Sequence, residues 1–372
     1  MSAPLKVLMA CTRFLPDMGG IENHVAEVAR RLHATGEFDI TVLATDRARR
    51  FRREDEIDGV RVLRVPAWPA DKDWYLSPGF APVVRRDEWD LVHVQGIHTP
   101  NPPAAMAGAL VARKPYVVSF HTGGHSSVLR NRLRSAQWWA LAPLLKRANA
   151  LIGVSEFEAT LVVDSAGIPR DRVRVIRNGG TLPEPTVTSH EPGLVVSTGR
   201  LERYKGHHRL IEALPYLRAV DPRARVEIIG AGPYESELHK LVDTLALQEH
   251  VTIRSVPPDD RVEMANALAK AEVVAVMSEY EAHPVGVMEA ISLGRPVVGM
   301  DVAGVGELVR LGWVNGISPT AGPRQLAEVI RSVAAKATQG RAGEALELPT
   351  WETSTAELAS LYREVADRRH VL

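Results

Sequence analysis

Two glutamates, Glu281 and Glu289, stand within residues 278–299 with seven residues between them. Each carboxylate can accept hydrogen bonds from two neighbouring hydroxyls, and bonds to a charged acceptor are the stronger kind. If a helix starts between them, Glu289 lies one turn beyond Val285 on the same helix face. One interpretation of the pair is therefore binding of a ligand rich in hydroxyls. Without the surrounding motifs we would favour the alternative, a solvated Glu289 and a Glu281 that interacts with the helix dipole.

A helix is predicted over residues 284–293, because Pro284 suits a first helical position and Gly294 can end a helix in the left-handed conformation. Gly286 leaves room for a ligand to approach the backbone. The preceding apolar run, 272–276, predicts a buried parallel strand, and ligands bind at the carboxyl ends of such strands. An anion is expected at the free amides that begin the helix, those of Val285, Gly286 and Val287.

Two cations follow another predicted strand, 194–197, in the stretch 199–206. Arg200 supplies a planar fork of donors and Lys205 a point charge, and both kinds of cation bind diphosphates. An arginine and a lysine five residues apart are, by themselves, weak evidence for a diphosphate site. Lysine is scarce in this arginine-rich chain, so its presence at 205 adds to the interpretation.

The amino-terminal half has two further candidates. Gly19 and Gly20 precede a predicted helix, 21–32, where a close backbone approach beside free amides suits a phosphate or a polar acceptor. His121 follows the predicted strand 116–120 and is placed to meet a ligand. The structural alternatives are an ordinary glycine turn and a histidine that only satisfies a local hydrogen bond.

Composition excludes several classes of protein. The chain of 372 residues is long enough for two domains, and its net charge of zero argues against a nucleic-acid partner. The single cysteine, Cys11, excludes an internal disulfide and is expected to be a packed thiol. No segment approaches the roughly 20 apolar residues of a membrane span, and no leader precedes the first strand, so a cytoplasmic protein is expected.

Strands and helices alternate along the chain, which predicts an α/β fold with doubly wound sheets. Helices are also predicted over 103–113, 325–336 and 351–368, and a flexible connection over 338–349. The proline-rich stretch 183–193 is a predicted linker between domains. The remaining strands are predicted at 6–10, 40–44, 60–65, 91–94, 150–154, 173–176, 225–229 and 251–256.

Two basic segments raise the alternative of a membrane surface. Residues 47–53 hold five arginines and one phenylalanine, and residues 126–147 alternate basic residues with tryptophans. Arginine favours anionic lipid and tryptophan the headgroup zone. We favour a solvated loop and a helix pair packed on the sheet, because a neutral chain exerts little long-range attraction.

These motifs together resemble the retaining GT-B glycosyltransferases of family 4, the glycosyl transferases group 1. The resemblance rests on Glu-x7-Glu at 281–289, Gly-Gly-x-Glu at 19–22, Gly-Arg-Leu with Lys-Gly at 199–206, and Gly-x-Gly-Pro at 230–233. It implies two Rossmann-like domains facing across a cleft. The chain departs from the family in lacking the usual aspartate after Asn178-Gly179 and in carrying Ser255 near a usual glycine.

The resemblance also implies a role for each candidate residue. The implied catalytic residues are His121, Arg200, Lys205 and Glu281. The implied donor-binding residues are Gly20, Gly232, Val256, His283, Pro284, Val285, Gly286, Val287 and Glu289. Gly19, Gly20 and His121 are implied on the acceptor side. No metal is expected, because Arg200, Lys205 and the helix amides near Gly286 would balance the charge of the diphosphate. No cofactor is expected, and the nucleotide sugar is the co-substrate.

The expected domains are an acceptor-binding domain, 1–182, the linker 183–193, a donor-binding domain, 194–350, and a helix, 351–372, that crosses back to the first domain. The implied reaction moves a sugar, from UDP by family frequency, to a hydroxyl of a small polar or lipid-linked acceptor with retention. Three alternatives remain. A GT-B epimerase or hydrolase would consume donor without acceptor, a phosphorylase would carry pyridoxal phosphate, and a binding protein would release no nucleotide.

Overall fold

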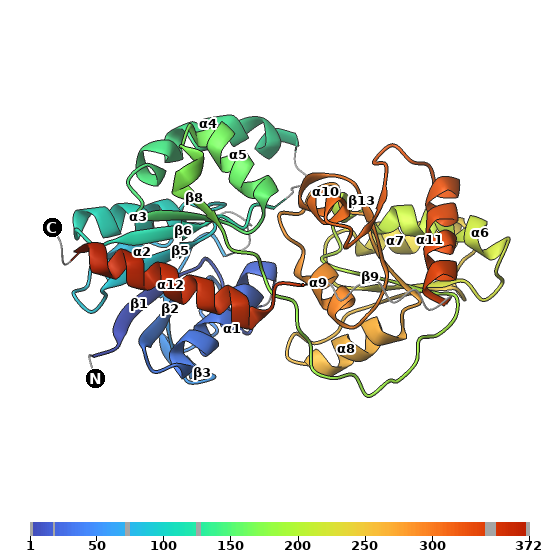
Figure 1. Ribbon diagram of the computed structural model, residues 1–372, viewed down its shortest axis with the longest axis horizontal. Helices are drawn as coiled ribbons and strands as arrows, with labels where there is room; N and C mark the ends of the chain where they lie inside the picture. Colours follow the sequence, from blue (N-terminus) through green and yellow to red (C-terminus); the bar gives the residue numbers. More distant parts are fainter. Residues whose placement is uncertain (1–2, 18, 71–74, 124–127, 339–346, 370–372) are drawn as a thin grey trace. The chain divides into compact units, whose positions relative to one another are not determined.

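The computed structural model describes residues 3–17, 19–70, 75–123, 128–338 and 347–369. The chain forms two compact units (Figure 1). Unit 1 comprises residues 1–122, 129–179 and 349–372, and unit 2 comprises residues 123–128 and 180–348. Each unit has one sheet between two layers of helices, which is the α/β architecture expected from the alternating pattern.

The sheet of unit 1 has eight strands in the order β3-β4-β2-β1-β5-β6-β7-β8. The strands are β1 (Leu5–Ala10), β2 (Phe38–Asp46), β3 (Glu54–Ile57), β4 (Val60–Pro66), β5 (Leu91–Gln95), β6 (Tyr116–Ser119), β7 (Ala150–Gly153) and β8 (Val173–Val175). Only β3 runs antiparallel to its neighbour. The seven parallel strands confirm the predicted ones, whereas β3 was not predicted because its three acidic residues leave almost no apolar signal.

The helices of unit 1 cover both faces of that sheet. One face carries α1 (Gly20–Ala34) and α12 (Trp351–Arg369), which pack together on Val7, Met9 and Val42. The other face carries α2 (Phe80–Val84), α3 (Asn101–Val111), α4 (Val128–Leu145) and α5 (Glu156–Ala166). Side chains therefore alternate between two cores along each strand, as a sheet buried on both faces requires.

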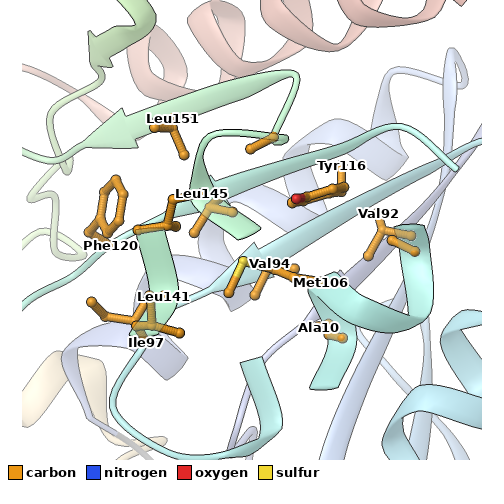
Figure 2. Packing of buried hydrophobic residues seen from close by; sticks show 14 of the residues in the cluster. Ala10, Val92, Val94, Ile97, Met106, Tyr116, Phe120, Leu141, Leu145 and Leu151 are labelled. Carbon is orange, nitrogen blue, oxygen red and sulfur yellow. The ribbon is translucent and has the colours of Figure 1, made fainter. Parts of the chain in front are cut away.

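Figure 2 shows the core on the α3 and α4 side, where Phe120, Leu141 and Leu145 belong to one cluster of buried side chains. Tyr116 is 1% exposed and donates its hydroxyl proton to the Leu144 carbonyl, so even its polar atom is satisfied. Cys11 lies in the opposite core and is fully buried, which confirms a packed thiol.

The sheet of unit 2 has six parallel strands in the order β11-β10-β9-β12-β13-β14. The strands are β9 (Leu194–Thr198), β10 (Arg225–Ile229), β11 (Val251–Arg254), β12 (Val273–Val276), β13 (Val297–Met300) and β14 (Asn315–Ile317). One face carries α6 (His207–Arg218), α7 (Glu235–Thr244) and α11 (Pro323–Thr338), and the other carries α8 (Arg261–Lys270), α9 (Val285–Ser292) and α10 (Ala303–Arg310).

The basic segment 126–147 differs from the prediction. The expected helix pair is wrong, because the described part of this segment forms the single helix α4. Of its paired tryptophans, Trp138 is buried in the core and Trp139 is 80% exposed. Among the described helices, none is long and apolar enough to cross a membrane. Most of the predicted connection 338–349 lies outside the described residues.

Candidate functional site

The turn between β12 and α9 is held in place by two glycines from other elements. A side chain on Gly206 would lie 2.0 Å from the Met277 carbonyl oxygen, and one on Gly304 would lie 1.9 Å from that of Ala282. The amide of Gly304 also donates to the Glu281 carbonyl at 2.8 Å. Only glycine permits such close approach, so the Lys205 loop and the start of α10 both pack directly on this turn.

Lys205 and Glu281 meet as a result. The Lys205 Nζ atom lies 2.5 Å from the Glu281 Oε1 atom, and each side chain is 17% exposed. Burial is the largest influence and alone would lower the pKa of Lys205, but Glu281 and Tyr204 together raise this pKa above its ordinary value. Lys205 is thus a cation at the carboxyl edge of the sheet, held by Glu281 and close to the ring of Tyr204.

Arg200 lies on the loop that follows β9. Its Nη2 atom lies 2.7 Å from Glu202 Oε1, and its side chain is 51% exposed. The backbone of this loop is anchored by His207, whose Nε2 lies 3.3 Å from the Arg200 carbonyl and whose Nδ1 lies 3.0 Å from Ser197 Oγ. Burial lowers the pKa of His207 to about 4, so this anchor is neutral at pH 7.

Gly232 has a structural reason to be glycine. A side chain there would lie 2.4 Å from the Leu201 carbonyl oxygen, so the 230–233 turn packs against the Arg200 loop. Val256 lies just beyond the carboxyl end of β11 and is half-buried against the core. Both predicted donor-side residues thus lie at the carboxyl edge of the sheet of unit 2.

The start of α9 differs in detail from the prediction. Pro284 precedes the helix instead of beginning it, with an extended backbone at ψ 113°. The amide of Val287 donates to the Pro284 carbonyl at 3.1 Å, so the expectation that it is free is wrong. Among the described residues, the amides of Val285 and Gly286 have no acceptor. The anion site predicted at this helix start is therefore reduced to two amides.

Gly286 faces the end of β9. A side chain on Gly286 would lie 2.9 Å from Thr198 Oγ1, which shows how little space separates α9 from that strand. Glu289 is 5% exposed and pairs with Arg261, so the interpretation as a solvated surface residue is wrong. His283 is equally buried and stands two residues after Glu281 in the same turn.

His121 belongs to unit 1 and lies just beyond the carboxyl end of β6. Its backbone has φ 48°, a value rare outside glycine, and its carbonyl accepts a bond from His98 Nε2 at 2.9 Å. The His121 Nε2 atom lies 2.9 Å from Gln95 Oε1, and the ring lies 4.6 Å, between centroids, from the His24 ring. Burial and the neighbouring histidines lower the pKa of His121 well below its ordinary value. This side chain is a neutral imidazole.

Glu158 holds the peptide that follows His121, and sequence reasoning missed it. This fully buried carboxylate accepts bonds from the Thr122 amide, from the Thr122 hydroxyl at 2.7 Å and from the Val154 amide at 2.8 Å. The sequence does carry a signal for it: Ser155 caps α5, and Glu158 stands at the capping-box position three residues later. Its side chain reaches the strand ends instead of the cap.

The glycine pair of unit 1 is covered by a carboxylate. A side chain on Gly19 would lie 2.6 Å from Glu22 Oε2, and the other Glu22 oxygen accepts a bond from Arg13 Nε at 3.0 Å. Gly20 begins α1, and a Cβ atom added to it would meet no heavy atom within 4 Å, so space remains beside it. A carboxylate at this place favours a hydroxyl ligand over the phosphate that the glycines alone allowed.

The structure thus gathers Lys205, Glu281 and Arg200 at one edge of unit 2, and His121 with the glycine pair at the carboxyl edge of unit 1. The residues that sequence reasoning missed, beside Glu158, are Arg13, Gln95, Glu202, His207 and Arg261. Among the described residues, no group of three or more histidines, cysteines or carboxylates could hold a metal ion.

Comparison with known proteins follows this division of the chain. Residues 18–180 match the family described as Glycosyltransferase Family 4, and residues 181–342 match Glycosyl transferases group 1. A glycogen synthase from Mycobacterium tuberculosis (strain ATCC 25618 / H37Rv) is 26% identical over 409 aligned positions, which cover 96% of this chain and 94% of that protein.

Two solved structures share the fold. The sucrose-phosphate synthase of Thermosynechococcus elongatus has a TM-score of 0.78 and 18% identity, covering 97% of this chain and 99% of that one. Anabaena Alr3699/HepE in complex with UDP-glucose has a TM-score of 0.72 and 21% identity, covering 97% and 100%. Fold and sequence matches together define a GT-B glycosyltransferase that uses a nucleotide sugar. The chain belongs to the retaining glycosyltransferases of family 4.

Proposed function

We propose that this enzyme transfers a hexose from a nucleoside-diphosphate sugar, with UDP-sugars the first candidates, to an acceptor hydroxyl with retention and without a metal. The observation that supports the proposal most strongly is the cluster at the carboxyl edge of unit 2. There, Lys205 contacts Glu281, with Arg200 on the same loop as Lys205 and two unused amides at the start of α9 among the described residues.

The chemistry of the cluster suits a departing diphosphate. Charge develops on the leaving phosphate as the bond to the sugar breaks, and fixed cations and amides that face this charge lower the barrier. Lys205 and Arg200 supply the cations. Glu281, held by Lys205, presents a carboxylate oxygen that accepts hydrogen bonds from sugar hydroxyls. The leaving phosphate then takes the proton of the attacking hydroxyl on the same face.

Three observations bear on the two substrates. Anabaena HepE, which shares the fold, holds UDP-glucose, so this donor is tested first. In unit 1 the neutral His121 ring and Glu22, beside the glycine pair, offer acceptors for hydroxyls, which supports a polar acceptor there. A small polar molecule and a lipid-linked sugar both meet this chemistry, and the two can be assayed in parallel.

The donor is tested by thermal melting with a panel of UDP-, GDP-, ADP- and dTDP-sugars. A ligand at a hundred times its Kd stabilises the folded state by about 2.7 kcal/mol, which is a measurable rise in Tm. We expect one nucleotide class to raise Tm in the wild type and to raise it less in Arg200→Ala. A panel in which no nucleotide sugar shifts Tm would overturn the proposal.

A further inference from the structure

A buried glutamine in unit 1 connects two histidines. Gln95 ends β5 and is 1% exposed. Its Oε1 atom lies 2.9 Å from His121 Nε2, and its Nε2 atom lies 3.2 Å from both ring nitrogens of His93. The two ends of one amide group therefore contact two different imidazole rings.

The contact with His121 determines which ring nitrogen carries the proton. An amide oxygen can only accept, so His121 Nε2 must donate and must carry the hydrogen. In a neutral imidazole the other nitrogen, Nδ1, then holds a lone pair. Among the described residues, His121 Nδ1 has no hydrogen-bond partner. His121 therefore presents an acceptor, and not a donor, at that atom.

The contact with His93 fixes the direction of the amide. His93 is fully buried, with Nδ1 2.5 Å from the Tyr362 hydroxyl and Nε2 2.8 Å from Ser119 Oγ. Burial lowers the pKa of His93 to about 3, so this ring is neutral and keeps one lone pair. The two hydroxyls take the in-plane positions at the ring nitrogens, and the Gln95 NH₂ group, equally distant from both nitrogens, lies over the ring face. That face is negative, so it favours N–H groups, whereas a flipped amide would bring its oxygen against it. Tyr362 of α12 thus supports the orientation of Gln95 through His93.

The position of the His121 ring is fixed independently. His24 packs against it, and the His24 ring itself lies 5.8 Å from the ring of Trp351, at the start of α12. The backbone at His121 is held by the bond from His98 and by Glu158 on the next peptide. Ring position and proton position are therefore set by different partners, so the proton position can be changed alone.

We propose that Gln95 is a positioning residue that holds His121 as the Nε2–H tautomer, so that Nδ1 accepts a hydrogen bond from a substrate hydroxyl. Gln95 itself touches no substrate. The hydroxyl partner rests on the proposed function, whereas the tautomer is a property of the protein alone. The two parts are therefore tested separately.

The tautomer is measured first, without substrate, by ¹⁵N NMR of the histidine rings, with the His121 signals assigned by their loss in His121→Asn. We expect the wild type to show a protonated Nε2 and a lone pair on Nδ1. Gln95→Leu removes the acceptor and should give a mixture of tautomers. Gln95→Glu keeps an acceptor, so it should keep the tautomer and raise the pKa of His121. A wild-type His121 with its proton on Nδ1, or a tautomer unchanged in Gln95→Leu, overturns the proposal.

Turnover is measured second, with the donor that the melting panel identifies. We expect Gln95→Leu to lower kcat about tenfold, the rate equivalent of one neutral hydrogen bond, with donor affinity unchanged. Gln95→Glu should recover most of this loss at alkaline pH, because His121 is neutral above its raised pKa and again carries its proton on Nε2. An unchanged kcat in Gln95→Leu contradicts the role of Nδ1.

Gln248→Leu is the matched control for these variants, because that amide bonds Asp243 on the surface of unit 2. It should leave both kcat and the His121 tautomer as they are in the wild type. A wild type that transfers no sugar contradicts the proposed function and leaves the NMR result standing, so the two failures can be told apart.

Discussion

At the residue scale, the contact between Lys205 and Glu281 unites two different tasks in one ion pair. In the proposed reaction, Lys205 faces the diphosphate, which becomes more negative, and Glu281 faces sugar hydroxyls, which keep their charge. Because Lys205 is held in place by Glu281 before any ligand arrives, its cation needs little reorganisation when charge develops on a leaving phosphate. The catalytic role proposed for Lys205 can be tested by a single substitution.

Lys205→Ala should lower turnover more than it weakens donor binding. Removing one preorganised group that faces developing charge typically costs roughly a hundredfold to a thousandfold in kcat. Initial rates and calorimetric titration with the nucleotide measure the two effects separately. Lys240→Ala is the matched control, because Lys240 also pairs with a glutamate in unit 2 but is 70% exposed. Equal losses in kcat and affinity would instead identify Lys205 as a ground-state binding residue.

At the element scale, the site of unit 2 depends on loops that touch through glycine. Gly206 has φ 73° and no room for a side chain against Met277, so the Lys205 loop and the end of β12 have one relative position. Gly232 fixes the Arg200 loop against the 230–233 turn in the same way. The glycines of these motifs therefore have a packing role that is independent of any ligand.

Gly206→Ala and Gly312→Ala form a matched pair that tests this role. Both glycines have nearly the same backbone, φ 73° and φ 75°, but a side chain on Gly312 meets no atom within 4 Å. Gly312→Ala should cost about 1 kcal/mol of unfolding free energy, from the left-handed backbone alone. Gly206→Ala adds overlap with a backbone carbonyl, so it should cost roughly 2 kcal/mol more and also lower kcat. Chemical denaturation measures both, and equal losses of stability would show that this contact is unimportant.

The helices, strands and turns also show which parts of the structure could be predicted from the sequence. The parallel strands of unit 1, four of the six in unit 2 and the turn at Glu281 were predictable, because long apolar runs and helix-ending glycines are local signals. The short strands β13 and β14 were not predicted. Nor were edge strand β3 and the partners of His121. Gln95 and Glu158 lie far along the chain from His121, and only the order of β5, β6 and β7 in the sheet brings them together. Likewise, the Pro284 carbonyl accepts a hydrogen bond from the Val287 amide. This bond depends on the local backbone geometry, which the spacing of residues in the sequence does not specify.

At the scale of the whole molecule, buried neutral histidines make both units sensitive to acid. Burial lowers the pKa of His24 and of His207 to about 4, and that of His93 to about 3. The unfolded chain takes up these protons near pH 6.5, whereas the folded protein does not, so stability is present above that pH and is lost as the pH falls toward 4. Each histidine contributes a slope of about 1.4 kcal/mol per pH unit in this window.

The midpoint of thermal unfolding should therefore fall steeply between about pH 6.5 and pH 5 and change little between pH 7 and pH 8. Scanning calorimetry across this range measures it. His207→Gln provides the control, since its amide can still reach Ser197 and the Arg200 carbonyl but does not titrate. This variant should show a shallower fall than the wild type. A midpoint that is flat from pH 7 to pH 5 would show that the histidines are not held neutral.

Transfer of a sugar to an acceptor hydroxyl with retention is tested most directly by one proton NMR time course. Donor, acceptor and enzyme are followed in one tube, and the anomeric coupling of each species is recorded. We expect nucleoside diphosphate to appear only when acceptor is present, and the new glycosidic bond to have the anomeric configuration of the donor. Nucleotide release at the same rate without acceptor, or a product of inverted configuration, would refute the proposed reaction.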